Sequence, residues 1–162
     1  MSATYSGNYP IERRAGEIER LNIQSKAMAP DTLAMLGRFG PMEGWACLDV
    51  GCGPGGITDL LSARVGRAGR VIGLDMDEEF LEYARRSAPT NVEFRRGDAY
   101  DADLPAGSFD LVHMPLSQAL PEVPIDCYRR RRAWYDRAAL LLYKNQTGQR
   151  LTAIRHTQRG TG

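Results

Sequence analysis

Four glycines directly behind one short apolar segment constrain the fold of this chain more than any other feature. Residues 46–50 read Ala-Cys-Leu-Asp-Val, and four of the next six residues are glycine. Apolar residues then recur at helical spacing from Ile57 to Val65. This pattern predicts a strand, a turn and a helix, because glycine reaches positive φ without a Cβ clash. The start of such a helix offers free N–H groups and a positive dipole end, so we expect a nucleotide-like cofactor there.

Two kinds of cofactor site share this pattern. The spacing Gly51-x-Gly53-x-x-Gly56 satisfies the dinucleotide fingerprint. An acid, Asp75, follows about 20 residues later, as in that fingerprint. Asp49, however, lies two residues before the first glycine, where its carboxylate would repel a pyrophosphate at close range. A positively charged ligand without phosphate suits this position better, and S-adenosylmethionine carries an ammonium, a sulfonium and no phosphate.

Strand-like segments recur along the chain at residues 70–75, 91–96 and 108–113, with helical segments at 55–65 and 77–87 between them. Strands alternating with helices indicate βαβ units, hence an α/β fold with a doubly wound, mostly parallel sheet. Ligands of such sheets bind at the carboxyl ends of the strands. The residues that fall at these ends are Asp49, Gly51, Asp75, Asp98 and His113.

Four motifs resemble those of the class I S-adenosylmethionine-dependent methyltransferases, in that family's order and at similar spacing. They are Asp49–Gly55 for the first motif, Val71–Asp77 for the second, Gly97–Ala99 for the adenine-side motif and Phe109–His113 for the fourth strand. The resemblance covers about residues 11–113 and implies a Rossmann-like fold. It also implies S-adenosyl-L-methionine as the cofactor and methyl transfer as the reaction, with a small molecule as the default methyl acceptor.

The resemblance assigns the methionine and ribose ends of the cofactor to the first two strands. Asp49 would orient the methionine ammonium, directly or through water. Gly51, Gly53 and Gly55 would let the backbone approach the ligand, beyond serving turn geometry. Asp75 would accept hydrogen bonds from both ribose hydroxyls, because one carboxylate suits a vicinal diol.

The adenine end and the reaction itself involve the later motifs. Met76 would pack on the adenine, Asp98 would accept from its amino group and Ala99 would offer a backbone N–H. Methyl transfer chiefly needs in-line positioning and the exclusion of water, because the sulfonium supplies the leaving group. His113 lies near the predicted rim and is a candidate general base. We favour the alternative in which it contributes only backbone to the cofactor wall.

Pattern and charge divide the chain into three parts. Residues 1–40 are predicted to form an N-terminal helical cap, residues 41–113 the cofactor-binding core and residues 114–162 a divergent basic segment. Up to His113 the chain has 12 basic and 17 acidic residues, and from Met114 onward it has 9 basic and 3 acidic residues. The abrupt change in charge favours a last part of different origin from the rest.

The cap is predicted to contain two helices, at residues 12–28 and 32–39, because Pro30 and the N-cap residue Asp31 separate them. In the resembled family such helices close over the cofactor and help to bind substrate. Tyr9 and Gln24 are the candidate lid contacts. The alternative is that the helices only cover one face of the sheet.

The last part departs from the family pattern, which continues with three more strands. A helix-like stretch at 126–145 and a loose alternation at 149–157 allow one helix and a fifth strand. Under either alternative the last family strands are missing, and we favour a replaced, truncated or frame-shifted end without a fifth strand. The fourth strand would then be an open edge and a surface for self-association. We interpret the arginine run at 129–132 as a solvated basic segment and expect no nucleic-acid partner.

Composition also bears on metal sites, disulfides, membrane spans and cellular location. The three cysteines show no metal-ligand spacing, so we expect no metal site and no disulfide framework, and a cytoplasmic location. No apolar run is long enough for a membrane span. Two competing functions stay open: an inactive cofactor-binding remnant of a methyltransferase and a nicotinamide-dependent oxidoreductase.

Overall fold

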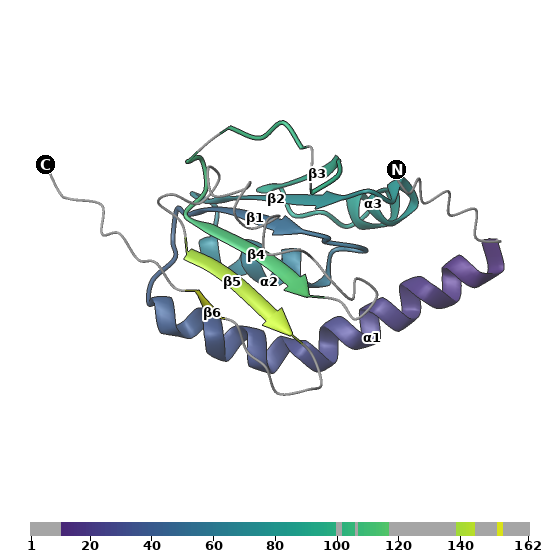
Figure 1. Cartoon of the computed structure of the whole chain (residues 1–162), viewed down its shortest axis with the longest axis horizontal. Helices are drawn as coiled ribbons and strands as arrows, with labels where there is room; N and C mark the ends of the chain where they lie inside the picture. Colours follow the sequence, from purple (N-terminus) through teal and green to yellow (C-terminus); the bar gives the residue numbers. More distant parts are fainter. Residues whose placement is uncertain (1–10, 100–101, 106, 117–138, 145–151, 154–162) are drawn as a thin grey trace, which may run out of the picture.

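The computed structural model describes residues 11–99, 102–105, 107–116, 139–144 and 152–153 of the 162-residue chain (Figure 1). Helices and strands alternate through most of the described part. They are α1 (Ile11–Leu36), the 3-10 helix η1 (Gly37–Phe39), β1 (Ala46–Val50), α2 (Gly56–Val65), β2 (Arg70–Asp75), α3 (Glu78–Arg85), β3 (Val92–Arg96), β4 (Leu111–Leu116), β5 (Ala139–Lys144) and β6 (Thr152–Ala153). The elements from β1 to β3 agree with their predicted bounds to within two residues.

The strands form one six-stranded sheet in the order β3-β2-β1-β4-β5-β6. The pairs from β3 through to β5 are parallel, and β6 pairs antiparallel with β5. The chain first adds strands on one side of β1 and then returns to its other side with β4. In α/β sheets, ligands bind in the crevice at such a reversal, outside the carboxyl ends of the strands. The predicted Rossmann-like α/β fold is confirmed.

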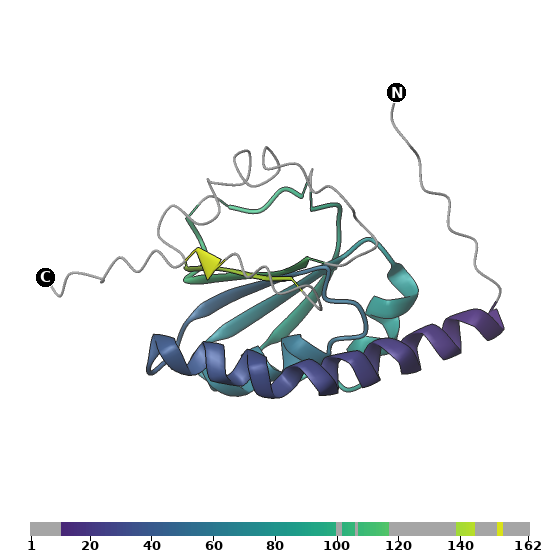
Figure 2. The same ribbon diagram turned by 60° about the horizontal axis from the view of Figure 1, so that its bottom comes forward.

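Alternate residues of the central strands face two separate apolar cores. Toward the helices, the strand residues in the core are Cys47, Val71 and Leu111. Toward the other face, they are Leu48, Ile72 and Val112. The three described α-helices lie on the first face (Figure 2). Leu104 and Phe109, from the segment that precedes β4, pack on the second face. Burial on both faces explains why β1 reads as a continuous apolar run.

The predicted break in the N-terminal cap is wrong, because α1 runs from Ile11 to Leu36 with Pro30 inside it. Proline removes one backbone donor and crowds the preceding turn, so a helix usually breaks there. Here the turns beyond it are anchored in the core, since Thr32 is 2% exposed and Leu36 is fully buried. Tertiary burial of the last turns thus outweighs the local cost of Pro30.

The end of the sheet also differs from expectation. β4 occupies Leu111–Leu116, beyond the predicted 108–113, so His113 lies within the strand and not at its end. β5 lies at Ala139–Lys144, inside the stretch predicted to be helical, and pairs with β4. The prediction of an open edge at β4 is therefore wrong, and the argument for self-association through that edge falls with it.

Other predictions about the chain ends are not tested. The described residues contain two strands after β4, where the resemblance implies three. Tyr9 and the arginine run at 129–132 lie outside the described residues, and the division at residues 40 and 113 stays a prediction. Among the helices of the described part, none is both long and apolar enough to cross a membrane.

Candidate cofactor site

The glycine loop between β1 and α2 is tied to the end of β2 by its own backbone N–H groups. Gly51 N and Cys52 N both donate to the Leu74 carbonyl oxygen, over 2.7 and 3.1 Å. Gly53 N donates to Asp75 Oδ2 over 2.8 Å. Pro54 has no N–H to offer, and Gly55 N donates to the Cys52 carbonyl over 3.1 Å. The donors of the loop itself are thus used within the protein.

The loop conformation requires glycine. Gly51, Gly53 and Gly55 have φ values of 70°, 52° and 100°, which residues with a Cβ rarely adopt. Gly51 is exposed, and a Cβ built on it would meet no atom within 4 Å. The start of the loop therefore borders open space and presents bare backbone to it, as the resemblance implies for a bound ligand.

Asp75 lies at the carboxyl end of β2, beside the loop. Its Oδ2 accepts from Gly53 N, and its Oδ1 accepts from Asp77 N over 2.9 Å. Burial raises the pKa of Asp75 above its usual range, although the backbone N–H groups oppose the shift. Each carboxylate oxygen has a second lone pair, so this side chain still has acceptor capacity for two hydroxyl groups. The predicted diol-binding role fits this geometry.

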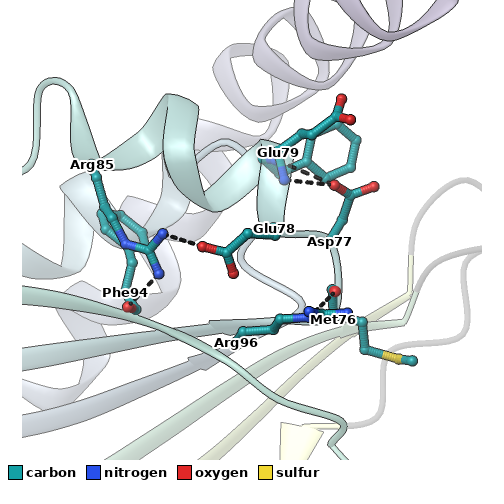
Figure 3. Close-up of polar contacts among 8 residues, drawn as sticks. Met76, Asp77, Glu78, Glu79, Arg85, Phe94 and Arg96 are labelled. Atoms are coloured by element: carbon teal, nitrogen blue, oxygen red, sulfur yellow. Dashed lines mark hydrogen bonds and ion pairs between the residues drawn. The ribbon is translucent and has the colours of Figure 1, made fainter. Parts of the chain in front are cut away.

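The surroundings of Asp75 are held by polar contacts between β2, α3 and β3 (Figure 3). Asp77 Oδ1 caps α3 by accepting from Glu79 N over 3.0 Å. Arg96 Nε donates to the Met76 carbonyl over 3.3 Å. Met76 is 59% exposed, so it is accessible to a ligand, and its packing on adenine stays a prediction.

Asp98 and Ala99 follow β3 at the same edge of the sheet. Both are half-buried, and Ala99 packs against the second core. Gly97 N donates to the Asp75 carbonyl oxygen over 2.9 Å. The backbone bond places the predicted adenine-side motif directly beside the predicted ribose-binding acid.

Asp49 lies beneath the loop and not in front of it. Its side chain is 1% exposed, its Oδ2 accepts from Thr58 Oγ1 over 2.6 Å, and its Oδ1 lies 2.7 Å from His113 Nδ1. Each oxygen thus has one polar partner within the protein. The predicted role of Asp49 in orienting a ligand ammonium, directly or through water, stays a prediction.

The His113 side chain is buried within the sheet and lies against Asp49. His113 pairs in register with Asp49 across β1 and β4, and its ring is 1% exposed. A general base must reach the proton that it abstracts, whereas this imidazole is directed at Asp49. The sequence had singled out Asp49 and His113 separately. Their contact and the part of Thr58 were missed, because both depend on strand register and on how α2 packs.

Helix α1 borders the glycine loop. The N-terminal cap was predicted either to close over the cofactor or only to cover one face of the sheet. A Cβ on Gly56 would lie 2.6 Å from the Ser25 Cβ, and one on Gly53 would lie 3.8 Å from Leu21 Cδ1. Asn22 Nδ2 donates to the Tyr83 hydroxyl of α3 over 3.4 Å. α1 therefore packs against both the core and the loop. The side chain of the predicted lid residue Gln24 accepts a hydrogen bond from Arg20 Nη1 of the same helix, over 3.3 Å.

Comparisons with known proteins agree with this geometry. The family model described as "Methyltransferase domain" matches residues 47–130. The chain is similar to nocamycin O-methyltransferase of Saccharothrix syringae, at 38% identity over 75% of this chain and 45% of that protein. It is also similar to demethylmenaquinone methyltransferase of Lactococcus lactis, at 43% identity over 46% of this chain and 31% of that protein. The chain thus spans less than half the length of either curated relative.

A solved structure shares the fold. The chain is similar to a SAM-dependent methyltransferase from Aquifex aeolicus, with a TM-score of 0.68 and 26% identity, over 83% of this chain and 77% of that one. S-adenosylmethionine is the methyl donor of the matched family. On its motifs, its sheet and its glycine loop, the chain belongs to the class I S-adenosylmethionine-dependent methyltransferase family.

Proposed function

We propose that the protein transfers a methyl group from S-adenosylmethionine to a small molecule. The observation that carries the proposal is the glycine loop, which presents bare backbone at Gly51 while its own N–H groups bind Leu74 and Asp75. Such a loop suits a cofactor that needs close backbone approach but brings no phosphate to be cradled.

The hydrogen bonds made by the loop N–H groups also argue against a nicotinamide cofactor. Dinucleotide sites use free backbone N–H groups of the glycine turn and helix start to hold a pyrophosphate. In this chain the N–H groups of Gly51, Cys52 and Gly53 are already donated to β2. The buried carboxylate of Asp49 lies beneath the same loop, and it would repel the pyrophosphate.

The proposed roles follow from position at the sheet edge. Asp75 accepts from the ribose hydroxyls, Met76 packs on the adenine, and Asp98 with the backbone of Ala99 contacts the adenine edge. When bound, the cofactor supplies a sulfonium leaving group. The protein then has to hold the acceptor in line and to exclude water. We assign no general base, because the His113 imidazole is directed at Asp49.

The class of acceptor is proposed from the relatives. The names of the nocamycin and demethylmenaquinone methyltransferases are those of enzymes acting on small molecules. A small molecule is therefore the proposed acceptor for this chain too. The cytoplasm is the proposed compartment, since Cys47 and Cys52 are free thiols and a reducing environment keeps them so.

Calorimetric titration with S-adenosylmethionine and S-adenosylhomocysteine tests the proposal. We expect micromolar binding that Asp75→Ala abolishes. Glu93→Ala is the matched control, because it also removes one carboxylate but from an exposed pair with Arg95. Stronger binding of NADH than of either nucleoside would refute the assignment. Binding without turnover across a broad panel of acceptors would reduce the protein to a cofactor-binding module.

A further inference from the structure

A buried polar cluster lies beneath the glycine loop, and no step of methyl transfer described above uses it. Asp49, Thr58 and His113 are 1%, 0% and 1% exposed. Removing a carboxylate and an imidazole from water is costly unless each polar atom finds a partner. Apolar side chains of similar size would fill the same space without that cost. The cluster is therefore a feature that packing alone does not explain.

The hydrogen bonds match an ionised Asp49. An ionised carboxylate only accepts hydrogen bonds. Thr58 Oγ1 supplies one donor, 2.6 Å from Oδ2. His113 Nδ1 lies 2.7 Å from Oδ1, where a proton on Nδ1 would supply the other. A neutral imidazole with its proton on Nδ1 meets this need. In that state the cluster carries one net negative charge directly under the loop.

The charge of Asp49 acts on groups in the loop and in the helix behind it. Burial raises the pKa of the Cys52 thiol above its usual range, and the charges of Asp49 and Asp75 raise it further. Burial also raises the pKa of Asp59, in the first turn of α2, and the charge of Asp49 adds to that shift. Both groups thus lie within reach of the Asp49 charge.

We propose that Thr58 and His113 are positioning residues that hold ionised Asp49 beneath the loop, where its charge favours a cationic sulfonium ligand over a neutral thioether. The inference rests on the proposed function. Because the Asp49 side chain is 1% exposed, the attraction acts across the loop as a field. It therefore discriminates by net charge, and S-adenosylmethionine carries one more positive charge than S-adenosylhomocysteine. The field would favour replacement of the spent product by fresh cofactor.

The test measures the ratio of the dissociation constants of S-adenosylhomocysteine and S-adenosylmethionine by calorimetry. This ratio is insensitive to partial unfolding, because unfolded protein weakens the apparent binding of both ligands by the same factor. Two charges about 10 Å apart at an effective dielectric of about 20 attract strongly enough to change a binding constant roughly tenfold. Asp49→Asn, which keeps shape and removes charge, should lower the ratio by about that factor.

Matched pairs of variants distinguish a positioning role of Thr58 and His113 from a purely packing role. Thr58→Val and His113→Leu remove the donors and should lower the ratio toward that of Asp49→Asn. Thr58→Ser and His113→Asn keep a donor at the same place and should restore most of it. A merely structural role would change the melting temperature of all four variants and leave the ratio unchanged.

The outcomes distinguish the two proposals. Wild-type protein that binds neither ligand rejects the proposed function and this inference together. Wild-type protein that binds both, with a ratio unmoved in Asp49→Asn or in both donor-free variants, rejects the inference alone. If His113→Leu does not fold, the Thr58→Val and Thr58→Ser pair decides.

Discussion

The Phe94 ring on β3 covers two glycines of the site, and the two should respond differently to an added methyl group. A Cβ on Gly73, its partner in the β2–β3 register, would lie 2.7 Å from Phe94 Cδ1 and 3.0 Å from Cys52 Sγ. A Cβ on Gly55 would lie 3.2 Å from Phe94 Cζ. Gly55 also has a φ of 100°, whereas Gly73 is not among the glycines with positive φ. Steric contact alone opposes a side chain at Gly73, and backbone strain adds to it at Gly55.

The magnitudes follow from these two causes. Favourable carbon contacts lie at about 3.5–4.0 Å, so Gly73→Ala must displace the Phe94 ring. Overpacking of this kind costs about 1–3 kcal/mol, and we expect Gly73→Ala to destabilise the fold by about 2 kcal/mol. Left-handed backbone costs a non-glycine residue about 1–2 kcal/mol. Gly55→Ala should therefore cost about as much, but for a different reason.

A double-mutant cycle with Phe94→Leu tests the distinction. Urea unfolding followed by circular dichroism gives the free energy of unfolding for each variant. In the Phe94→Leu background the cost of Gly73→Ala should fall, leaving only the contact with Cys52 Sγ. Gly55→Ala should keep about 1–2 kcal/mol of backbone strain. Gly16→Ala is the control, because that helical glycine meets no atom within 4 Å, and it should be neutral or stabilising. Equal costs of Gly73→Ala in both backgrounds would refute the steric explanation.

Two further predictions concern pH and the end of α2. Because burial raises the pKa of Asp75, S-adenosylmethionine binding should weaken on acidification at a higher pH than an exposed aspartate would give, and Asp75→Asn should lose this dependence in calorimetry. The sign for folding is opposite: the contribution of Asp75 to stability is present at low pH and is lost as pH rises through the raised pKa. Asn91 Nδ2 donates to the Ser62 and Gly66 carbonyls over 3.3 and 2.8 Å. Asn91→Asp replaces these donors with negative charge and should cost about 2 kcal/mol, so an unchanged thermal midpoint would contradict this account.

The sequence by itself determined the features that depend on neighbouring residues. Positive φ in the loop, the strand before it and the helix behind it follow from residues 46–65 alone. The parallel sheet and its binding edge follow from the alternation of strands and helices. For the same reason spacing placed Asp75 and Asp98 at that edge, and the family resemblance added Met76 and Ala99.

The features that depend on residues distant in the sequence were decided only by the tertiary structure. Local signals predicted a break at Pro30, but burial of Leu36 in the core keeps α1 continuous. Helical spacing was predicted around residues 139–144, where pairing with β4 instead gives a strand. Asp49 and His113 are 64 positions apart, and they meet only once β1 and β4 pair in register. A buried carboxylate takes the partners that the assembled sheet brings to it, so its role beneath the loop is decided by the fold and not by its motif.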